Sequence, residues 1–293
     1  MYNGEPQGSR NFQFVNRKLS IVNPRVPNLW DTHSHTAVFA CVVVSSVVER
    51  EELMIAKAAQ WIGMRRKQED AYAVKFFRAG VLAVVCDGMG GHHDGALAST
   101  LATEEYVKSF ERNDDLPMVQ RMRHALDDAN DAVRKSFESR GVYGGTTLVA
   151  AFAGSGVLRW VSVGDSALYL WRRGRLIRLN QDHSYRDVYR AYIGAGMTAQ
   201  EALRRGHVLR CAITGESLDL VDAPTIPYPL LPEDRIVLTT DGSEEILAPE
   251  LLTNVGRNIL NNREGSLPVA LIEACQALGD PYADNTTIVS IDV

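Results

Sequence analysis

The order of its apolar segments constrains the fold of this chain most strongly. Short apolar runs typical of buried strands come in groups, and stretches with the apolar spacing of helices come in pairs between them. A protein built from βαβ units would instead alternate single strands with single helices. The order therefore predicts an α+β protein in which strands and helices form separate layers.

The predicted elements occupy most of the chain after an N-terminal arm. Residues 1–35 are rich in Asn, Pro, Arg and Gly, so we expect an irregular arm there and one domain over 36–293. A capping box at Thr198–Glu201 predicts a short helix. Helical spacing also marks 94–113, 117–139, 243–260 and 266–279. Strand-like runs lie at 37–48, 53–61, 80–86, 146–153, 158–163, 167–171, 175–179, 207–213, 221–228, 235–240 and 286–291.

Composition excludes several classes of protein. Apolar residues make up 45% and charged residues 23%, and the net charge of −5 gives no sign of a basic surface that binds nucleic acid. The longest apolar run, 37–48, is shorter than the about 20 residues of a membrane-spanning helix, so no membrane span is expected. No CxxC pair occurs, which predicts reduced thiols in a cytoplasmic protein; the cysteines are Cys41, Cys86, Cys211 and Cys275.

Acidic residues recur where apolar runs end. Asp87, Asp165 and Asp241 each follow such a run and precede Gly or Ser, and Glu69-Asp70 and Asp284-Asn285 lie beside other runs. Any one of them is an ordinary turn signal. Carboxylates brought together repel one another unless cations neutralise them, and hard divalent ions prefer oxygen ligands. No His/Cys set that would favour zinc accompanies them.

From Arg65 to Val293 the chain resembles the bacterial form of the metal-dependent protein phosphatases, the type 2C family. Each matching motif alone is short, but all of them stand in family order. They are Arg65–Tyr72, Asp87–His92, Gly144–Thr147, Val163–Ser166, Asp182–Ser184, Thr240–Gly242 and Asp284–Thr287.

The resemblance implies a fold and an activity. The family fold is a four-layer α-β-β-α sandwich, with two central antiparallel sheets flanked by helical pairs. The family activity is hydrolysis of phosphoserine and phosphothreonine by a hydroxide that bridges two divalent ions, Mn²⁺ or Mg²⁺. The implied partners are phosphorylated proteins, the targets of serine/threonine kinases.

The resemblance also assigns the metal ligands. Asp87 would bridge the two ions. Glu69 and the carbonyl of Gly88 would complete the shell of one ion, and Asp241 and Asp284 would bind the other.

Further roles follow from the same resemblance. Asp70 would orient metal-bound water, and Arg65 would hold the substrate phosphate, with Arg66 as a competing candidate. Asp165 matches the residue that, with Asp241, holds a weaker third ion. Glu245 stands where the family often has an Asp that supports this ion, so a third site is in doubt.

The pattern departs from the family at several other positions. Gln68 replaces an Asn, which conserves an amide, and Ala167 replaces a common Arg, a change we leave unexplained. Met89 stands where eukaryotic members have a His proposed as general acid. We interpret His92 and His93 as solvated loop residues.

Three other functions compete with an active phosphatase. A catalytically quiet pseudophosphatase that binds partners would usually lack one of the metal carboxylates, and all four are present here. An adaptor domain would leave the family order of the motifs unexplained. A metal-dependent nuclease would be expected to have a basic stripe, which this acidic chain lacks.

Overall fold

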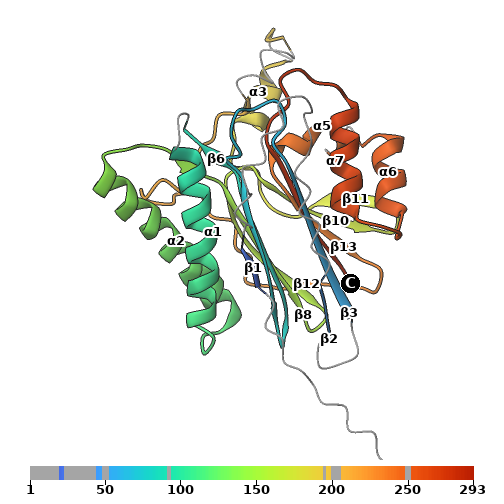
Figure 1. Cartoon of the computed structure of the whole chain (residues 1–293), viewed down its shortest axis with the longest axis horizontal. Helices are drawn as coiled ribbons and strands as arrows, with labels where there is room; N and C mark the ends of the chain where they lie inside the picture. The colour runs from blue at the N-terminus through green and yellow to red at the C-terminus, as the bar shows by residue number, and fades with distance from the viewer. Residues whose placement is uncertain are drawn as a thin grey trace, which may run out of the picture.

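A computed structural model describes residues 20–22, 44–47, 53–90, 94–193, 196–198, 206–247 and 252–293. Two six-stranded antiparallel sheets form its centre (Figure 1). The described helices include none that is long and apolar enough to cross a membrane.

The first sheet is built mainly from two hairpins, which lie within residues 71–163. All its neighbouring strands pair antiparallel. In spatial order the strands are β1 (Ser20–Val22), β4 (Ala71–Phe77), β5 (Gly80–Cys86), β8 (Leu148–Gly154), β9 (Val157–Val163) and β12 (Tyr228–Pro229).

The second sheet joins strands from both ends of the chain, again all antiparallel. Its order is β11 (Arg175–Arg178), β10 (Ala167–Arg172), β13 (Arg235–Thr239), β14 (Thr286–Asp292), β3 (Leu53–Trp61) and β2 (Val44–Val47). A separate two-stranded ribbon consists of β6 (Gly88–Met89) and β7 (Gly145–Thr146).

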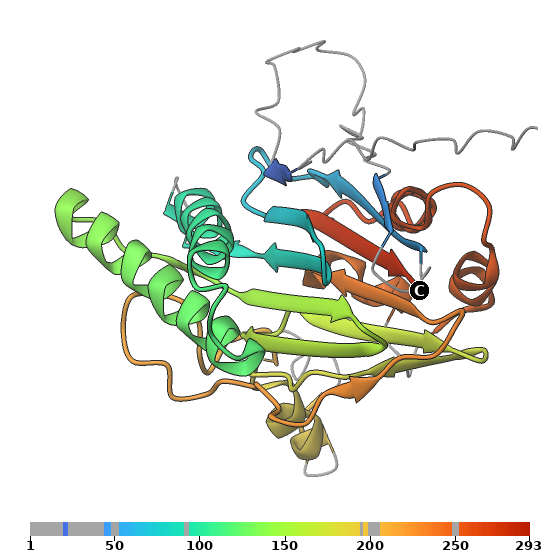
Figure 2. The same ribbon diagram turned by 90° about the horizontal axis from the view of Figure 1, so that it is seen from below.

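Helices cover the outer face of each sheet (Figure 2). The first sheet carries α1 (Asp94–Arg112) and α2 (Met118–Arg140). The second carries α5 (Glu244–Leu247), α6 (Asn254–Asn261) and α7 (Leu267–Ala277), which follow the 3₁₀ turn η1 (Asp241–Ser243). The helix α3 (Arg186–Ile193) lies at one end of the sandwich in Figure 1. The four-layer α-β-β-α prediction is therefore confirmed.

Strand β5 shows why the layers stack in this way. All seven of its residues are buried. Leu82 and Val84 belong to the core beneath α1 and α2, whereas Ala83 and Val85 belong to the core between the sheets. Side chains alternate along a strand, so an unbroken apolar run is stable only where both faces of the strand are covered.

The local predictions were right for most strands and wrong for some loops. Sequence patterns missed β4 and α3. The strands predicted at 207–213 and 221–228 were largely wrong, because 207–213 makes only isolated bridges and 221–228 makes one bridge before Tyr228 enters the two-residue strand β12. Three residues of the expected irregular arm form β1. The capping-box helix at Thr198–Glu201 falls mainly outside the described residues, as do His92 and His93.

Candidate active site

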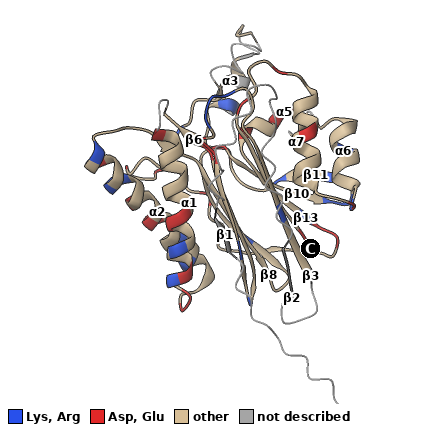
Figure 3. Ribbon diagram, viewed as in Figure 1, with Lys and Arg blue, Asp and Glu red and all other residues tan. Residues whose placement is uncertain are grey.

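Strand direction brings the acidic positions to one end of the sandwich. In the first sheet β5 ends beside Asp87 and β4 begins after Asp70. In the second, β13 ends beside Asp241 and β14 begins two residues after Asp284. Asp165 follows β9, which runs parallel to β5 because each is antiparallel to β8. Figure 3 shows acidic segments in red at this end, near β6 and α5.

Asp70 links the two sheets. Its Oδ2 accepts hydrogen bonds from the hydroxyls of Thr240, at 3.0 Å, and Thr287, at 2.7 Å. Its Oδ1 is buried and has no hydrogen-bond partner. Burial raises the pKa of Asp70 to about 8, because a charge is poorly stabilised away from water. The unpartnered oxygen suits a group that orients a bound water.

The backbone around Asp87 is fixed by two threonines. The Asp87 N–H donates to the hydroxyl of Thr147 at 2.9 Å, and the Asp87 carbonyl accepts from the hydroxyl of Thr146 at 2.8 Å. Burial raises the pKa of the Asp87 carboxyl well above its ordinary value, and the charges of Asp70 and Asp241 add to this effect. Carboxylates so placed favour a cation among them.

The carboxyls of Asp241 and Asp165 are affected in the same way. Burial raises the pKa of Asp241 to about 6, with a further contribution from the charge of Asp284. Burial raises the pKa of Asp165 to about 7, with Asp241 the next cause. Asp87, Asp165, Asp241 and Asp284 are thus close enough to interact electrostatically.

Gly88 sits in a tight backbone contact. A Cβ atom added to it would lie 2.3 Å from the carbonyl oxygen of Gly95 and 2.4 Å from that of Glu69. Glu69 is itself held through its N–H, which donates to the side chain of Asn285 at 2.8 Å. The chain thus brings the backbones of Glu69 and Gly88 together.

Arg65 reaches the same site from the loop after β3. Its Nη2 lies 2.6 Å from Oδ2 of Asp284, and 57% of the Arg65 side chain is exposed. Arg66 is also exposed. The contact favours Arg65 over Arg66 as the residue near the metal carboxylates.

The donor set suits hard divalent ions. The five assigned ligands offer only oxygen atoms, which Mg²⁺ and Mn²⁺ accept. Among the described residues, no three His, Cys, Asp or Glu side chains are placed to hold an ion by themselves. Water and the Gly88 carbonyl would therefore have to complete the coordination, as is usual for Mg²⁺.

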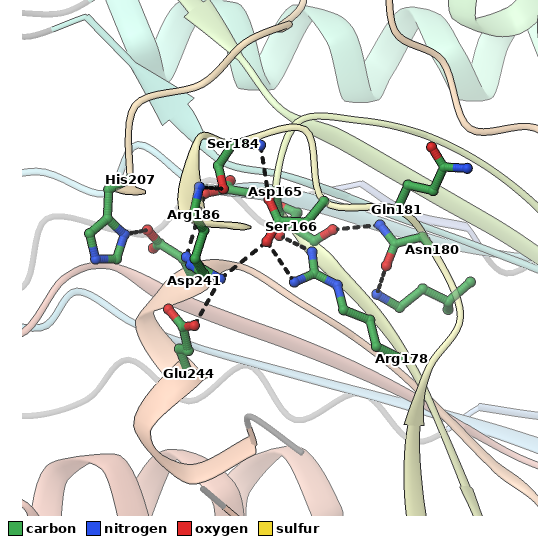
Figure 4. A network of polar contacts seen from close by, with 12 residues as sticks. Asp165, Ser166, Arg178, Asn180, Gln181, Ser184, Arg186, His207, Asp241 and Glu244 are labelled. Atoms are coloured by element: carbon green, nitrogen blue, oxygen red, sulfur yellow. Dashed lines mark hydrogen bonds and ion pairs between the residues drawn. The ribbon is translucent and has the colours of Figure 1, made fainter. Parts of the chain in front are cut away.

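The structure does not bring Glu245 to Asp165. Glu245 is exposed, and its charge acts on Cys275 of α7. The preceding residue, Glu244, faces the site instead and lies 2.8 Å from Arg186. The Arg186 guanidinium lies 4.0 Å from the Asp165 carboxylate (Figure 4).

Sequence reasoning missed several of these residues. Arg186 lies four positions after Asp182 of the Asp182–Ser184 motif and forms an ion pair with it, a spacing that could have been noticed. His207 was also missed; its Nδ1 lies 3.9 Å from Oδ2 of Asp241. No local pattern marks this contact, since 34 residues separate the two in the chain.

Comparisons with known proteins bear on the site. The family model described as Protein phosphatase 2C matches residues 63–281. The serine/threonine phosphatase stp of Listeria welshimeri is 28% identical over 169 residues, which cover 55% of this chain and 66% of that protein. The serine/threonine protein phosphatase PstP of Mycobacterium tuberculosis is 30% identical over 223 residues, which cover 72% of this chain and 40% of that protein.

Solved structures show the same fold. The catalytic domain of PstP in complex with two manganese ions has a TM-score of 0.64 and 26% identity, and the match covers 82% of this chain and 97% of that one. PppA of Pseudomonas aeruginosa has a TM-score of 0.62 and 26% identity, with 82% and 98% covered.

Proposed function

This chain belongs to the protein phosphatase 2C family, and on that premise we propose that it is a serine/threonine protein phosphatase that requires two divalent metal ions. The observation that carries the proposal is the convergence of Asp87, Asp241 and Asp284, with raised pKa values at the first two, beside the exposed guanidinium of Arg65. Acidic side chains in such a cluster favour bound cations. A phosphate bound there would face both positive charge and N–H donors.

The residues have separate tasks in the proposed reaction. Asp87 would contact both ions, with Glu69 and the Gly88 carbonyl on one side and Asp241 and Asp284 on the other. When bound, two such ions would lower the pKa of water at the site and so supply the nucleophile for direct hydrolysis. The chain would thus form no covalent phosphoenzyme.

Arg65 would orient the phosphate of the substrate. A guanidinium has five N–H donors, so its contact with Asp284 leaves others for phosphate oxygens. Its 57% exposed side chain is accessible to a phosphorylated loop of another protein. Asp70 would hold and orient a water through its unpartnered Oδ1.

The competing function is a pseudophosphatase that binds phosphorylated partners without hydrolysing them. Both functions would use Arg65, but only hydrolysis needs the full carboxylate set. A cytoplasmic location, a role in signalling and substrates phosphorylated by serine/threonine kinases remain predictions.

Hydrolysis of three substrates by the purified chain tests the proposal. Phosphate release from p-nitrophenyl phosphate, a phosphothreonine peptide and a phosphotyrosine peptide is measured with Mn²⁺, with Mg²⁺ and with EDTA. We expect metal-dependent turnover of the phosphothreonine peptide and little turnover of the phosphotyrosine peptide. Binding of the phosphothreonine peptide without hydrolysis in either metal would favour the pseudophosphatase.

A further inference from the structure

Arg186, the first residue of α3, carries a buried positive charge among acidic side chains that belong to three parts of the fold. Its Nη1 lies 2.8 Å from Oε1 of Glu244 on α5 and 3.3 Å from Oδ2 of Asp182 in the loop before α3. Its Nη2 lies 4.0 Å from Oδ2 of Asp165, which follows β9. Figure 4 shows Arg186 beside the side chains of Glu244 and Asp165.

This guanidinium is not satisfied by hydrogen bonds alone. Arg186 is only 9% exposed, and its Nη2 is buried without a hydrogen-bond partner. A charged donor left unpaired in the interior is unfavourable. The negative charges of the surrounding carboxylates offset this cost and hold the side chain in place. Burial acts to lower the pKa of Arg186, and the charges of Glu244, Asp182 and Asp165 outweigh it and raise the pKa.

The backbone of Arg186 is also fixed. Its N–H donates a hydrogen bond to the hydroxyl oxygen of Ser184 at 3.2 Å. Gly206 packs against it closely, since a Cβ added to Gly206 would lie 3.2 Å from the Arg186 Cα. The start of α3 is therefore anchored at the carboxylates by both its backbone and its side chain.

We propose that Arg186 is a positioning residue whose guanidinium serves as the built-in cation of the acidic group formed by Asp165, Asp182 and Glu244. It holds the first turn of α3 against the active site. It also neutralises the carboxylate of Asp165, so that this side of the site takes no divalent ion of its own. This inference rests on the proposed two-ion phosphatase and limits its metal content to two.

The positive charge near Asp165 disfavours an additional divalent ion there. A divalent ion beside Asp165 would be repelled by the guanidinium about 4 Å away from that carboxylate. A second guanidinium also engages the group, because Arg178 lies 2.9 Å from Asp182 and donates to the Asp165 carbonyl at 2.7 Å. Removal of the Arg186 charge would leave Asp165 and Glu244 without this counter-ion.

The test counts Mn²⁺ ions bound to the full chain by equilibrium dialysis with electron paramagnetic resonance, up to millimolar Mn²⁺. We expect two ions in the wild type and in Arg186→Lys, and a third, weaker one in Arg186→Met. Hydrogen exchange of the first turn of α3 should become at least about tenfold faster in Arg186→Met. Arg210→Met, which removes an exposed arginine that stacks on Tyr185, should keep two ions.

Other outcomes would overturn the inference. A third ion in the wild type would contradict it, as would two ions with unchanged α3 exchange in Arg186→Met. If Arg186→Met does not fold, Asp165→Asn decides: an unchanged count of two agrees with the inference, and the loss of an ion contradicts it.

The ion count and the turnover of the wild type separate this inference from the proposed function. An active wild type with three ions would contradict the role of Arg186 alone. A wild type that binds two ions and hydrolyses no phosphopeptide would contradict the proposed function alone.

Discussion

The Arg65 guanidinium donates a 2.6 Å hydrogen bond to the carboxylate of Asp284, although 219 residues separate the two in the chain. The contact joins the loop after β3 to the loop before β14, which are neighbouring strands of the second sheet. It places the side chain proposed to bind phosphate directly beside a proposed metal ligand.

Replacement of Arg65 tests this placement. Arg65→Lys keeps the charge and loses the paired N–H geometry, so we expect kcat/KM for a phosphothreonine peptide to fall about 10- to 100-fold. Steady-state kinetics at saturating Mn²⁺ measure the change. Arg66→Lys, at the exposed neighbouring position, is the matched control and should stay within about twofold of the wild type. Equal losses in both variants would contradict the assignment.

The raised pKa of Asp70, about 8 against an ordinary 3.8, predicts how stability depends on pH without metal. Between these values the folded protein keeps a proton that the unfolded chain releases. Proton binding by Asp70 therefore makes its full favourable contribution to the free energy of folding below about pH 4, and this contribution is lost as the pH rises towards 8. We expect the free energy of unfolding in EDTA, relative to that of Asp70→Asn, to fall from pH 5 to pH 8.

Urea unfolding of both proteins at several pH values measures this difference. The comparison with Asp70→Asn removes the contributions of groups that do not interact with Asp70, such as buried His183, whose pKa burial lowers. A relative stability that rises with pH would show that Asp70 is ionised in the folded, metal-free protein.

Gly88 should tolerate no side chain. In Gly88→Ala the new methyl would overlap the carbonyl oxygens of Gly95 and Glu69. We therefore expect the free energy of unfolding to fall by roughly 1–3 kcal/mol, and the metal-dependent activity to fall as well. Gly156→Ala is the control. Alanine at its φ of +72° destabilises the fold by about 1 kcal/mol, but the added methyl would meet no other atom. Thermal unfolding measures both. An unchanged melting temperature in Gly88→Ala would be incompatible with the described packing.

Much of the fold was predictable because buried strands correspond to apolar runs in the sequence. β5 and β3 were expected at the residues where they occur, since β5 is buried throughout and most of the described side chains of β3 are buried. β4 was missed because only its first half is fully buried and it follows directly after the polar motif at Gln68–Asp70. The run 207–213 was misassigned because its apolar residues pack through isolated bridges rather than a continuous ladder.

The candidate site was predictable only where its residues lie in recognisable motifs. Asp87 and Asp241 were found in this way. Arg186, Glu244 and His207 were not, because their contacts depend on how α3 and α5 meet the strand ends. Such contacts join residues with no fixed spacing in the chain, so no local pattern identifies them.

The central claim is that Asp87 holds the metal ions that drive hydrolysis, and Asp87→Asn tests it most directly. The amide conserves size and removes a buried charge, so the variant should fold and match or exceed the wild type in melting temperature in EDTA. We predict that its Mn²⁺-dependent phosphate release from a phosphothreonine peptide falls at least about a hundredfold. Turnover close to that of the wild type in a folded Asp87→Asn protein would contradict the account.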